Sequence, residues 1–256
     1  MSFSNIILLF LAAVLGGTLN SVAGGGSFFT FPALIFGGVP PIPANATSTV
    51  ALWPGSIAGA SAYRRELAAI DRRLMIVLVI TSLVGGILGA ILLLITPQAI
   101  FTTLLPYLLL IATLLFTFSG PVTKRLRVRN VGKSSLTARH LIGISVAQFI
   151  IAVYGGYFGG GIGILMLATL ALMGLENIHV MNGLKTVLAA CINGVAVITF
   201  VVAGAVFWPE AIVMVIGAII GGYGGAYYAR KVDPRWIRVF VIVVGFAMTV
   251  YFFIKG

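Results

Sequence analysis

Charged residues are scarce in this 256-residue chain: they make up 8% of it, whereas 60% of the residues are hydrophobic. A soluble globular domain carries charge on about 25% of its residues, so this chain has too little polar surface to cover itself in water. The mean hydropathy of +1.16 agrees with this conclusion. Long apolar runs favour helices, because the strands of a membrane barrel would alternate in polarity over about ten residues. The composition therefore predicts an all-α, polytopic membrane protein.

Acidic residues are the rarest charged group. The five carboxylates all lie in or near predicted turns: Glu66, Asp71, Glu176, Glu210 and Asp233. Cation carriers and proton pumps usually need an acidic side chain inside the membrane to compensate the charge that they move. No apolar segment has one at its centre, which argues against both functions. An anion requires the opposite chemistry, namely N–H donors, hydroxyls, amides and a cation.

Cysteine and histidine are also nearly absent. Cys191 is the single cysteine, which excludes an internal disulfide and argues against a metal cluster, and no cofactor is expected. An intramembrane hydrolase using Ser27 is a remote alternative, because His140 and His179 both lie at segment edges and a buried Ser–His pair is hard to build. We therefore expect no enzyme. The chain also lacks a nucleotide-binding Gly-x-x-x-x-Gly-Lys-Ser/Thr sequence, so a solute gradient is the expected source of energy.

Basic residues outnumber acidic ones by 16 to 5, but their positions argue against nucleic-acid binding. Fourteen of the 16 lie in three short stretches: Arg64, Arg65, Arg72 and Arg73; Lys124, Arg125, Arg127, Arg129, Lys133 and Arg139; Arg230, Lys231, Arg235 and Arg238. Clusters beside membrane helices are typical of cytoplasmic loops, where they also attract anionic lipids. The expected partners are thus the lipid bilayer and a small anion, and the sequence leaves the oligomeric state open.

Apolar segments divide the chain into two similar halves. A membrane span needs about 20 apolar residues, and the segments lie at 4–22, 27–37, 45–63, 74–95 and 98–119, then at 139–158, 162–175, 181–204, 210–229 and 236–254. A basic linker at 120–138 separates a first membrane repeat (1–119) from a second (139–256). The second segment of each half is short, so it is a half-helix, a re-entrant segment or a tilted span. The prediction is eight to ten membrane segments.

Two features bear on the ends of the early segments. The first segment lacks a basic leading region and an Ala-x-Ala cleavage site, so we expect it to be a retained helix rather than a signal peptide. Pro40, Pro41 and Pro43 predict a stiff, non-helical connection before the third segment.

Three adjacent glycines interrupt the apolar sequence in each half: Gly24, Gly25 and Gly26, then Gly159, Gly160 and Gly161. Each glycine costs a helix about 1 kcal/mol relative to alanine, so a helix should break at both places. Within a bilayer, such breaks are tolerated only inside protein or along a water-filled cavity. Short helices that begin after each break would point the positive ends of their dipoles at mid-membrane. Paired interruptions of this kind predict the substrate site of a transporter.

The two halves match beyond the glycines. Residues 45–50 align with 182–187, residues 85–90 with 221–226, and Pro97 with Pro234. In the first half the turn after the third segment is basic and the next turn is not, whereas the second half shows the reverse order. Equivalent turns therefore lie on opposite faces of the membrane. This pattern predicts two repeats of inverted topology, with both termini outside the cytoplasm and the linker inside.

Polar residues near the breaks are candidate ligands: Asn20, Ser27, Asn45, Thr47, Ser48, Asn182, Lys185, Thr186 and Asn193, together with the six glycines. Ser27 either caps its helix or contacts the substrate. Lys185, the only base within an apolar segment, either contacts an anion or extends to the cytoplasmic surface or pairs with Glu176. Asn193 lies on about the same helical face and either shares the pocket or bridges helices. Gln148 is expected to bridge helices.

At these residues the sequence resembles the TauE/SafE sulfite exporter family, also called the toluene sulfonate uptake permease family. The resemblance rests on Asn-Ser-Val-Ala-Gly-Gly-Gly-Ser at 20–27, Gly-Tyr-Phe-Gly-Gly-Gly-Ile-Gly at 156–163, Asn-Ala-Thr-Ser at 45–48 and Asn-Gly-Leu-Lys at 182–185. It implies a membrane protein, here of a prokaryotic plasma (inner) membrane, that moves a small sulfur-containing anion such as sulfite or an organosulfonate. It also supports the two glycine runs, Ser27, Asn45 and Lys185 as site residues.

The sequence thus predicts a secondary carrier for a small oxyanion, with export favoured over uptake. The alternatives are a passive anion channel, whose pore would use the same donors, and a carrier of another small organic anion.

Overall fold

The computed structural model describes residues 2–22, 25–63, 67–68, 70–129, 138–172, 175, 177–228 and 234–255. These residues form ten α-helices and no strand: α1 (Phe3–Val22), α2 (Ser27–Phe36), α3 (Pro41–Ala62), α5 (Arg72–Ile95), α6 (Gln98–Arg129), α7 (Ala138–Tyr157), α8 (Ile162–Leu172), α9 (Ile178–Val202), α10 (Trp208–Tyr228) and α11 (Pro234–Lys255). The predicted all-helical fold is confirmed for this part of the chain. Within the described ranges, four stretches are long and apolar enough to cross a membrane: Phe3–Asn20, Arg72–Ile95, Gln98–Phe118 and Val180–Val202.

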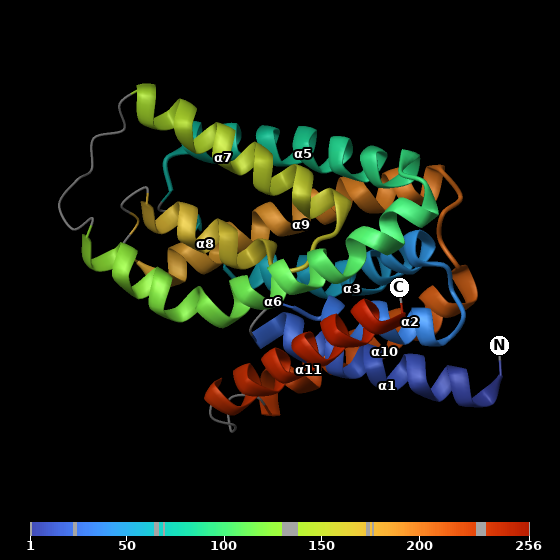
Figure 1. The fold of residues 1–256 in the computed structure, drawn as a ribbon. Coiled ribbons are helices and arrows are strands. Elements are labelled where there is room, and N and C mark those ends of the chain that lie inside the picture. Colours follow the sequence, from blue (N-terminus) through green and yellow to red (C-terminus); the bar gives the residue numbers. More distant parts are fainter. Residues whose placement is uncertain are drawn as a thin grey trace.

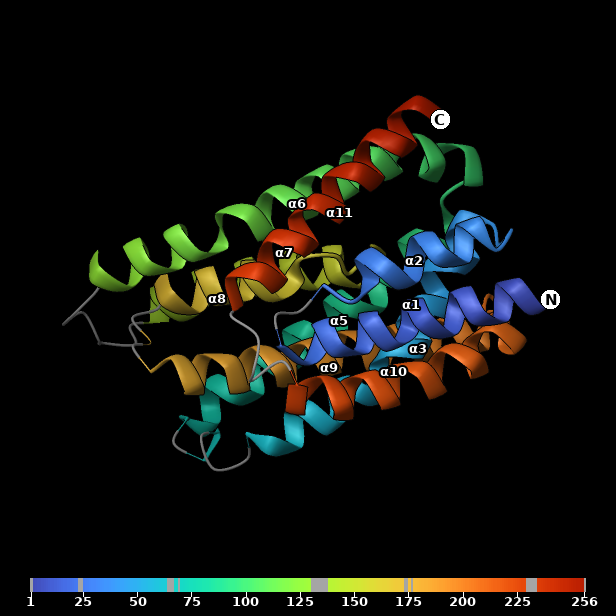
Figure 2. The same cartoon turned by 90° about the horizontal axis from the view of Figure 1, so that it is seen from below.

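The helices lie roughly along one direction, so the bundle has two ends (Figure 1). We call the end at which α1 begins and α11 ends the terminal end. At the opposite end α3 and α6 end, and α5, α7 and α11 begin; we call it the basic end because the three predicted basic clusters flank these helix ends in the sequence. The view in Figure 2 shows the same separation. Which end faces the cytoplasm stays a prediction.

The two short segments are half-length helices, and a re-entrant path through the membrane stays a prediction. At a rise of about 1.5 Å per residue, the 10 residues of α2 and the 11 of α8 each cover about half of a bilayer core, which is about 30 Å thick. Asn5 near the start of α1 donates a hydrogen bond of 3.5 Å to the carbonyl of Gly37, just beyond α2. The short helix α2 therefore returns to the end at which α1 begins. In Figure 1, α8 likewise returns towards the basic end, where α7 begins.

Each contact between helices of the two halves has an equivalent contact in which the halves trade places. The first helix of each half packs against the fourth helix of the other, since α1 contacts α10 and α7 contacts α5. The third helices, α3 and α9, contact each other, and so do the fifth, α6 and α11. These pairings support an internal repeat, whose inverted orientation across the membrane stays a prediction.

Small residues allow the first helix of each half to approach the fourth helix of the other half closely. A side chain on Gly85 of α5 would meet the carbonyl of Phe149 in α7 at 2.9 Å, and one on Gly221 of α10 would overlap the carbonyl of Val14 in α1. The α5–α7 interface also buries Gln148, which donates a 2.8 Å hydrogen bond to the Ser82 hydroxyl. Gln148 therefore bridges helices, as predicted.

Two segment boundaries differ from the prediction. The helix α3 begins at Pro41 and includes Pro43, so these two prolines do not form a non-helical connection. Their missing N–H groups cost nothing in the first turn, where N–H groups have no partner within the helix. The helix α6 continues to Arg129, through residues 120–129 of the predicted linker. Lysine and arginine are good helix formers, and their charge suits the C-terminal end of a helix dipole.

Candidate functional site

The two glycine breaks line one cavity of about 190 Å³. Gly25 and Ser27 of the first break and Gly159 and Gly161 of the second contribute to its wall. As predicted, α2 begins directly after Gly26 and α8 directly after Gly161. The structure therefore brings together two segments that lie in different halves of the chain.

The backbone at the breaks requires glycine. Gly25, Gly159 and Gly161 have φ angles of 102°, 80° and 77°, which residues with a side chain rarely adopt. Gly26 is the N-cap of α2, and no side chain caps the helix. Ser27 is thus not the cap, and only its predicted role as a ligand remains.

The first turn of α8 lies at the wall of the cavity. Ile162 and Gly163 line the cavity, and within the described residues their N–H groups have no acceptor. Unpaired N–H groups at a helix N-terminus, together with the helix dipole, favour an anion.

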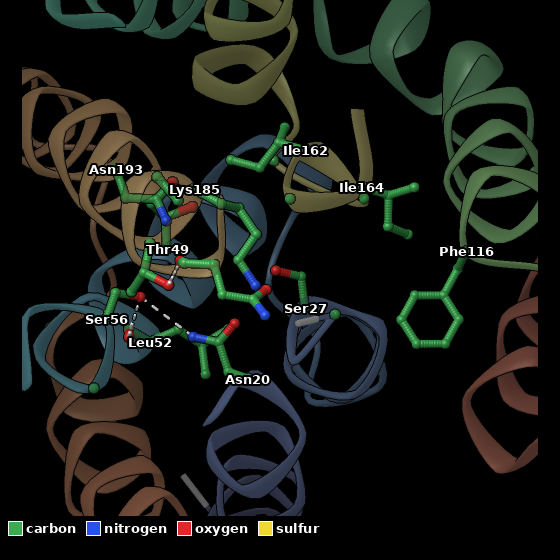
Figure 3. A pocket seen from close by; sticks show the side chains of 18 of the residues that line it. Asn20, Ser27, Thr49, Leu52, Ser56, Phe116, Ile162, Ile164, Lys185 and Asn193 are labelled. Carbon is green, nitrogen blue, oxygen red and sulfur yellow. Dashed lines mark hydrogen bonds between the residues drawn. The ribbon is translucent and has the colours of Figure 1, made fainter. Parts of the chain in front are cut away.

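Polar side chains from four helices point into the same space (Figure 3). They come from the end of α1, the start of α2, the middle of α3 and one face of α9: Asn20, Ser27, Thr49, Ser56, Asn182, Lys185, Thr186 and Asn193. The α9 residues recur at intervals of three, four and seven positions, which places them on one helical face.

Lys185 extends past the first turn of α8 into the cavity (Figure 3). Its side chain packs over Gly163, where a Cβ atom would lie 3.2 Å from the lysine Cδ. In the described part of the chain, no residue pairs with its ammonium group and no carboxylate lines the cavity. Glu176, the predicted alternative partner, lies outside the described residues. An unpaired cation in a low-dielectric cavity attracts an anion.

Several donors around Lys185 are also unused. Among the described residues, the hydroxyl of Ser27 and the amides of Asn182 and Asn193 have no hydrogen-bond partner. Asn20 donates to the hydroxyl of Ser56 over 3.3 Å. The described lining residues therefore offer one cation and several free donors, which suits an oxyanion.

An apolar wall faces these polar groups. Phe116 of α6 and Ile164 of α8 lie on the side of the cavity opposite to Asn20 and Ser56 (Figure 3). The Phe116 ring packs edge-on against Phe28, with 6.4 Å between the ring centroids. The cavity therefore has one face for charge and one for an apolar group.

Three predicted ligands of α3 do not line the cavity. Asn45 donates to the carbonyl of Tyr157 over 3.0 Å. The hydroxyl of Thr47 accepts the N–H of Phe207 at 3.0 Å. The hydroxyl of Ser48 lies 2.6 Å from that of Thr30. All three side chains are buried, and their polar groups are used between the cavity and the terminal end.

Two of the predicted glycines, Gly26 and Gly160, are also absent from the cavity wall. A side chain on Gly26 would overlap the carbonyl of Gly16, and one on Gly160 would meet the Phe158 ring at 2.7 Å. Both are therefore packing positions. Gly24 lies outside the described residues, as do the side chains of His140 and His179, on which the hydrolase alternative depends.

Sequence reasoning missed Ser56, Tyr63 and Phe116, which all line the cavity. The alignment of residues 45–50 with 182–187, continued along both helices, pairs Ser56 with Asn193 and was a usable signal. Phe116 gives no such signal, because an aromatic residue within an apolar segment looks like any other core residue.

Known proteins resemble this chain over nearly its whole length. Residues 9–252 match the family model described as "Sulfite exporter TauE/SafE". The chain belongs to the TauE/SafE sulfite exporter family. Like other members, this TauE/SafE protein is a membrane transporter. No solved structure matches the chain.

Curated relatives of this TauE/SafE chain are named as probable transporters, and the similarity covers nearly their whole length. A "Probable membrane transporter protein" of Haemophilus influenzae is 29% identical over 245 residues, 95% of this chain and 92% of the relative. The "Probable membrane transporter protein ORF9" of a Sinorhizobium species is 29% identical over 254 residues, 98% and 93% of the two chains. The Escherichia coli K12 protein YfcA, with the same description, is 27% identical over 245 residues, 94% and 87%.

Proposed function

We propose that this transporter is a secondary carrier that exports a small sulfur-containing anion, such as sulfite or an organosulfonate, across the plasma (inner) membrane of a prokaryote. The observation that carries the proposal is the Lys185 ammonium group, which has no described carboxylate beside it in a cavity at the N-terminal ends of two half-helices. An anion bound there would be compensated by the lysine and by the helix dipoles. The name of the family supports both a sulfur oxyanion and export.

The size of the cavity suits a small anion. Its volume of about 190 Å³ is enough for sulfite with a few waters or for a short organosulfonate. The apolar wall beside Phe116 and Ile164 suits the organic group of a sulfonate.

A carrier is favoured over the passive channel. On the side of the terminal end, the cavity is covered by buried side chains such as Thr30, Phe31 and Ser48. A channel needs a continuous pathway in its conducting state, whereas a carrier exposes its site to one side at a time. The closed layer of side chains fits the second mechanism.

Counterflow in proteoliposomes tests the proposed function. Vesicles containing the purified protein would be loaded with unlabelled sulfite and diluted into a trace of labelled sulfite. A carrier should accumulate the label transiently, with a saturable initial rate, because the outward movement of unlabelled sulfite returns the binding site to the outer face. Toluene sulfonate, thiosulfate and sulfate as competitors would define the substrate. Label that only equilibrates, at a rate linear in concentration, would contradict a carrier.

The orientation of the bundle gives a second expected result. We expect both termini to be non-cytoplasmic and the basic end to be cytoplasmic, because basic residues are retained on the cytoplasmic side. An alkaline phosphatase fused after residue 256 should be active, and a green fluorescent protein at the same place should be dark. The same reporters inserted at residue 133 should give the opposite results. A fluorescent C-terminal fusion would contradict the inverted arrangement.

A further inference from the structure

The two halves contribute equally to the centre of the cavity. The alignment of Asn45 in α3 with Asn182 in α9, carried along both helices, pairs Thr49 with Thr186, Leu52 with Ala189 and Ser56 with Asn193. All six of these aligned residues line the cavity. The centre of the site is therefore symmetric in position, although not in residue type.

Towards the ends of the bundle this symmetry is lost. Asn182 and Lys185 lie in the part of α9 near the basic end and line the cavity. Their counterparts in α3, Asn45 and Ser48, lie towards the terminal end and are only 3% and 1% exposed. Tyr63, at the basic end, also lines the cavity. The cavity thus extends towards the basic end and is closed towards the terminal end.

A hydrogen bond between the two halves holds the closed side. The amide of Asn45 donates to the carbonyl of Tyr157 over 3.0 Å. Tyr157 is the last residue of α7 and lies two residues before the second glycine break. The bond therefore joins α3 of the first half to the first helix of the second half.

Towards the basic end, the chain has an equivalent asparagine amide and an equivalent backbone carbonyl, but no hydrogen bond joins them within the part of the chain that the structure describes. Asn182 is the counterpart of Asn45, and its amide has no partner among the described residues. Val22 is the counterpart of Tyr157, because α1 and α7 both have 20 residues and both end just before a glycine break. A bond from the Asn182 amide to the Val22 carbonyl would repeat the observed one, with the halves exchanged.

We propose that Asn45 and Asn182 are paired positioning residues of the transport cycle. In the present state Asn45 holds the carbonyl of Tyr157 and closes the terminal end. In the opposite state this bond opens, and Asn182 binds the carbonyl of Val22 and closes the basic end. This inference rests on the proposed carrier function and on the inverted repeat, since exchanging the conformations of inverted halves produces the second state.

The exchange of this one bond favours neither state. Within the asparagine pair, one amide–carbonyl bond replaces an equivalent one. A carrier needs this balance, because a state that is strongly preferred slows the return of the empty site. Loss of one of the two bonds should therefore shift the populations in a direction that depends on which asparagine is changed.

Cysteine accessibility in the purified full-length protein tests the pair without any substrate. In a Cys191→Ser background, Ser48→Cys reports opening of the terminal end and Tyr63→Cys reports opening of the basic end. Asn45→Ala should raise the maleimide labelling rate at Ser48→Cys and lower the rate at Tyr63→Cys. A shift of roughly twofold to tenfold is expected from one neutral hydrogen bond. Asn182→Ala should change both rates in the opposite directions.

Two further variants separate this role from a loss of stability. Gln148→Ala removes a buried hydrogen bond of 2.8 Å between α7 and α5, so it should lower the melting temperature and leave the ratio of the two labelling rates unchanged. Asn45→Gln keeps the amide and should restore part of the ratio. Equal shifts in the same direction for Asn45→Ala and Asn182→Ala, or no shift in folded protein, would overturn the proposal.

The result is also independent of the cargo. If the labelling shifts occur but the vesicles move no sulfite, the paired asparagines stand and the proposed substrate fails. If counterflow of sulfite is intact but the shifts are absent, the substrate stands and the asparagine pair fails.

Discussion

The Lys185→Ala variant is expected to lose at least nine-tenths of anion transport while still inserting into the membrane. The substitution removes the single cation that the described residues place in the cavity. Hydrogen bonds to charged groups contribute about 1.5–3 kcal/mol each, which corresponds to a loss of roughly tenfold to a hundredfold. Initial rates of labelled sulfite uptake into vesicles with equal amounts of protein measure this effect.

Two control variants show whether the loss of transport comes from the charge at position 185. Lys185→Arg keeps the charge but replaces a compact ammonium group by a planar guanidinium group, so it should retain part of the transport. Lys255→Ala removes a lysine that donates to the Tyr251 hydroxyl over 2.8 Å in an exposed position, and it should transport normally. Full activity of Lys185→Ala would show that transport does not depend on the lysine.

The Gly161→Ala variant is the second change with a large expected effect, a loss of transport of about tenfold or more. Gly161 has a φ of 77°, and an added Cβ would lie 3.4 Å from the backbone of Ala112. The left-handed conformation costs a residue with a side chain roughly 1–2 kcal/mol. Relief of this strain would turn the N–H groups of Ile162 and Gly163 away from the cavity. Uptake rates and melting temperatures should be measured on the same preparations.

Gly204→Ala is the control for this backbone strain. Gly204 has a φ of 66°, and an added Cβ would meet nothing within 4 Å. It lies in the turn between α9 and α10, away from the cavity wall. Both variants should lower the melting temperature by a similar amount, and only Gly161→Ala should lose transport. An equal loss of transport in both would assign the effect to general destabilisation.

The parts of the fold that follow from backbone chemistry could be predicted from the sequence. Gly25, Gly159 and Gly161 adopt φ angles that other residues avoid, so their positions marked the breaks and the starts of α2 and α8. The helix boundary at Pro41 could not be predicted in the same way. A proline is compatible with the first turn of a helix and with a loop, and the packing of the rest of the chain decides between them.

The site could be predicted in its type of chemistry but not in its full membership. Lys185 and the polar face of α9 were visible from residue type and spacing. Phe116 was not, because α6 reaches the cavity only through the packing of the whole bundle. Asn45 and Asn182 occupy equivalent places in the sequence, yet one is buried and the other lines the cavity. A sequence is common to all states of a carrier, so it cannot tell which side is open.

The first helix of each half packs against the other half, and this arrangement has a consequence for biogenesis. The α1 surface around Val14 and Gly17 is covered by α10, and the α5 surface around Gly85 and Gly89 is covered by α7. When the ribosome has completed only the first half, both surfaces lack their partners. A nascent half therefore cannot reach its final packing alone, and assembly has to wait until the last helices are synthesised.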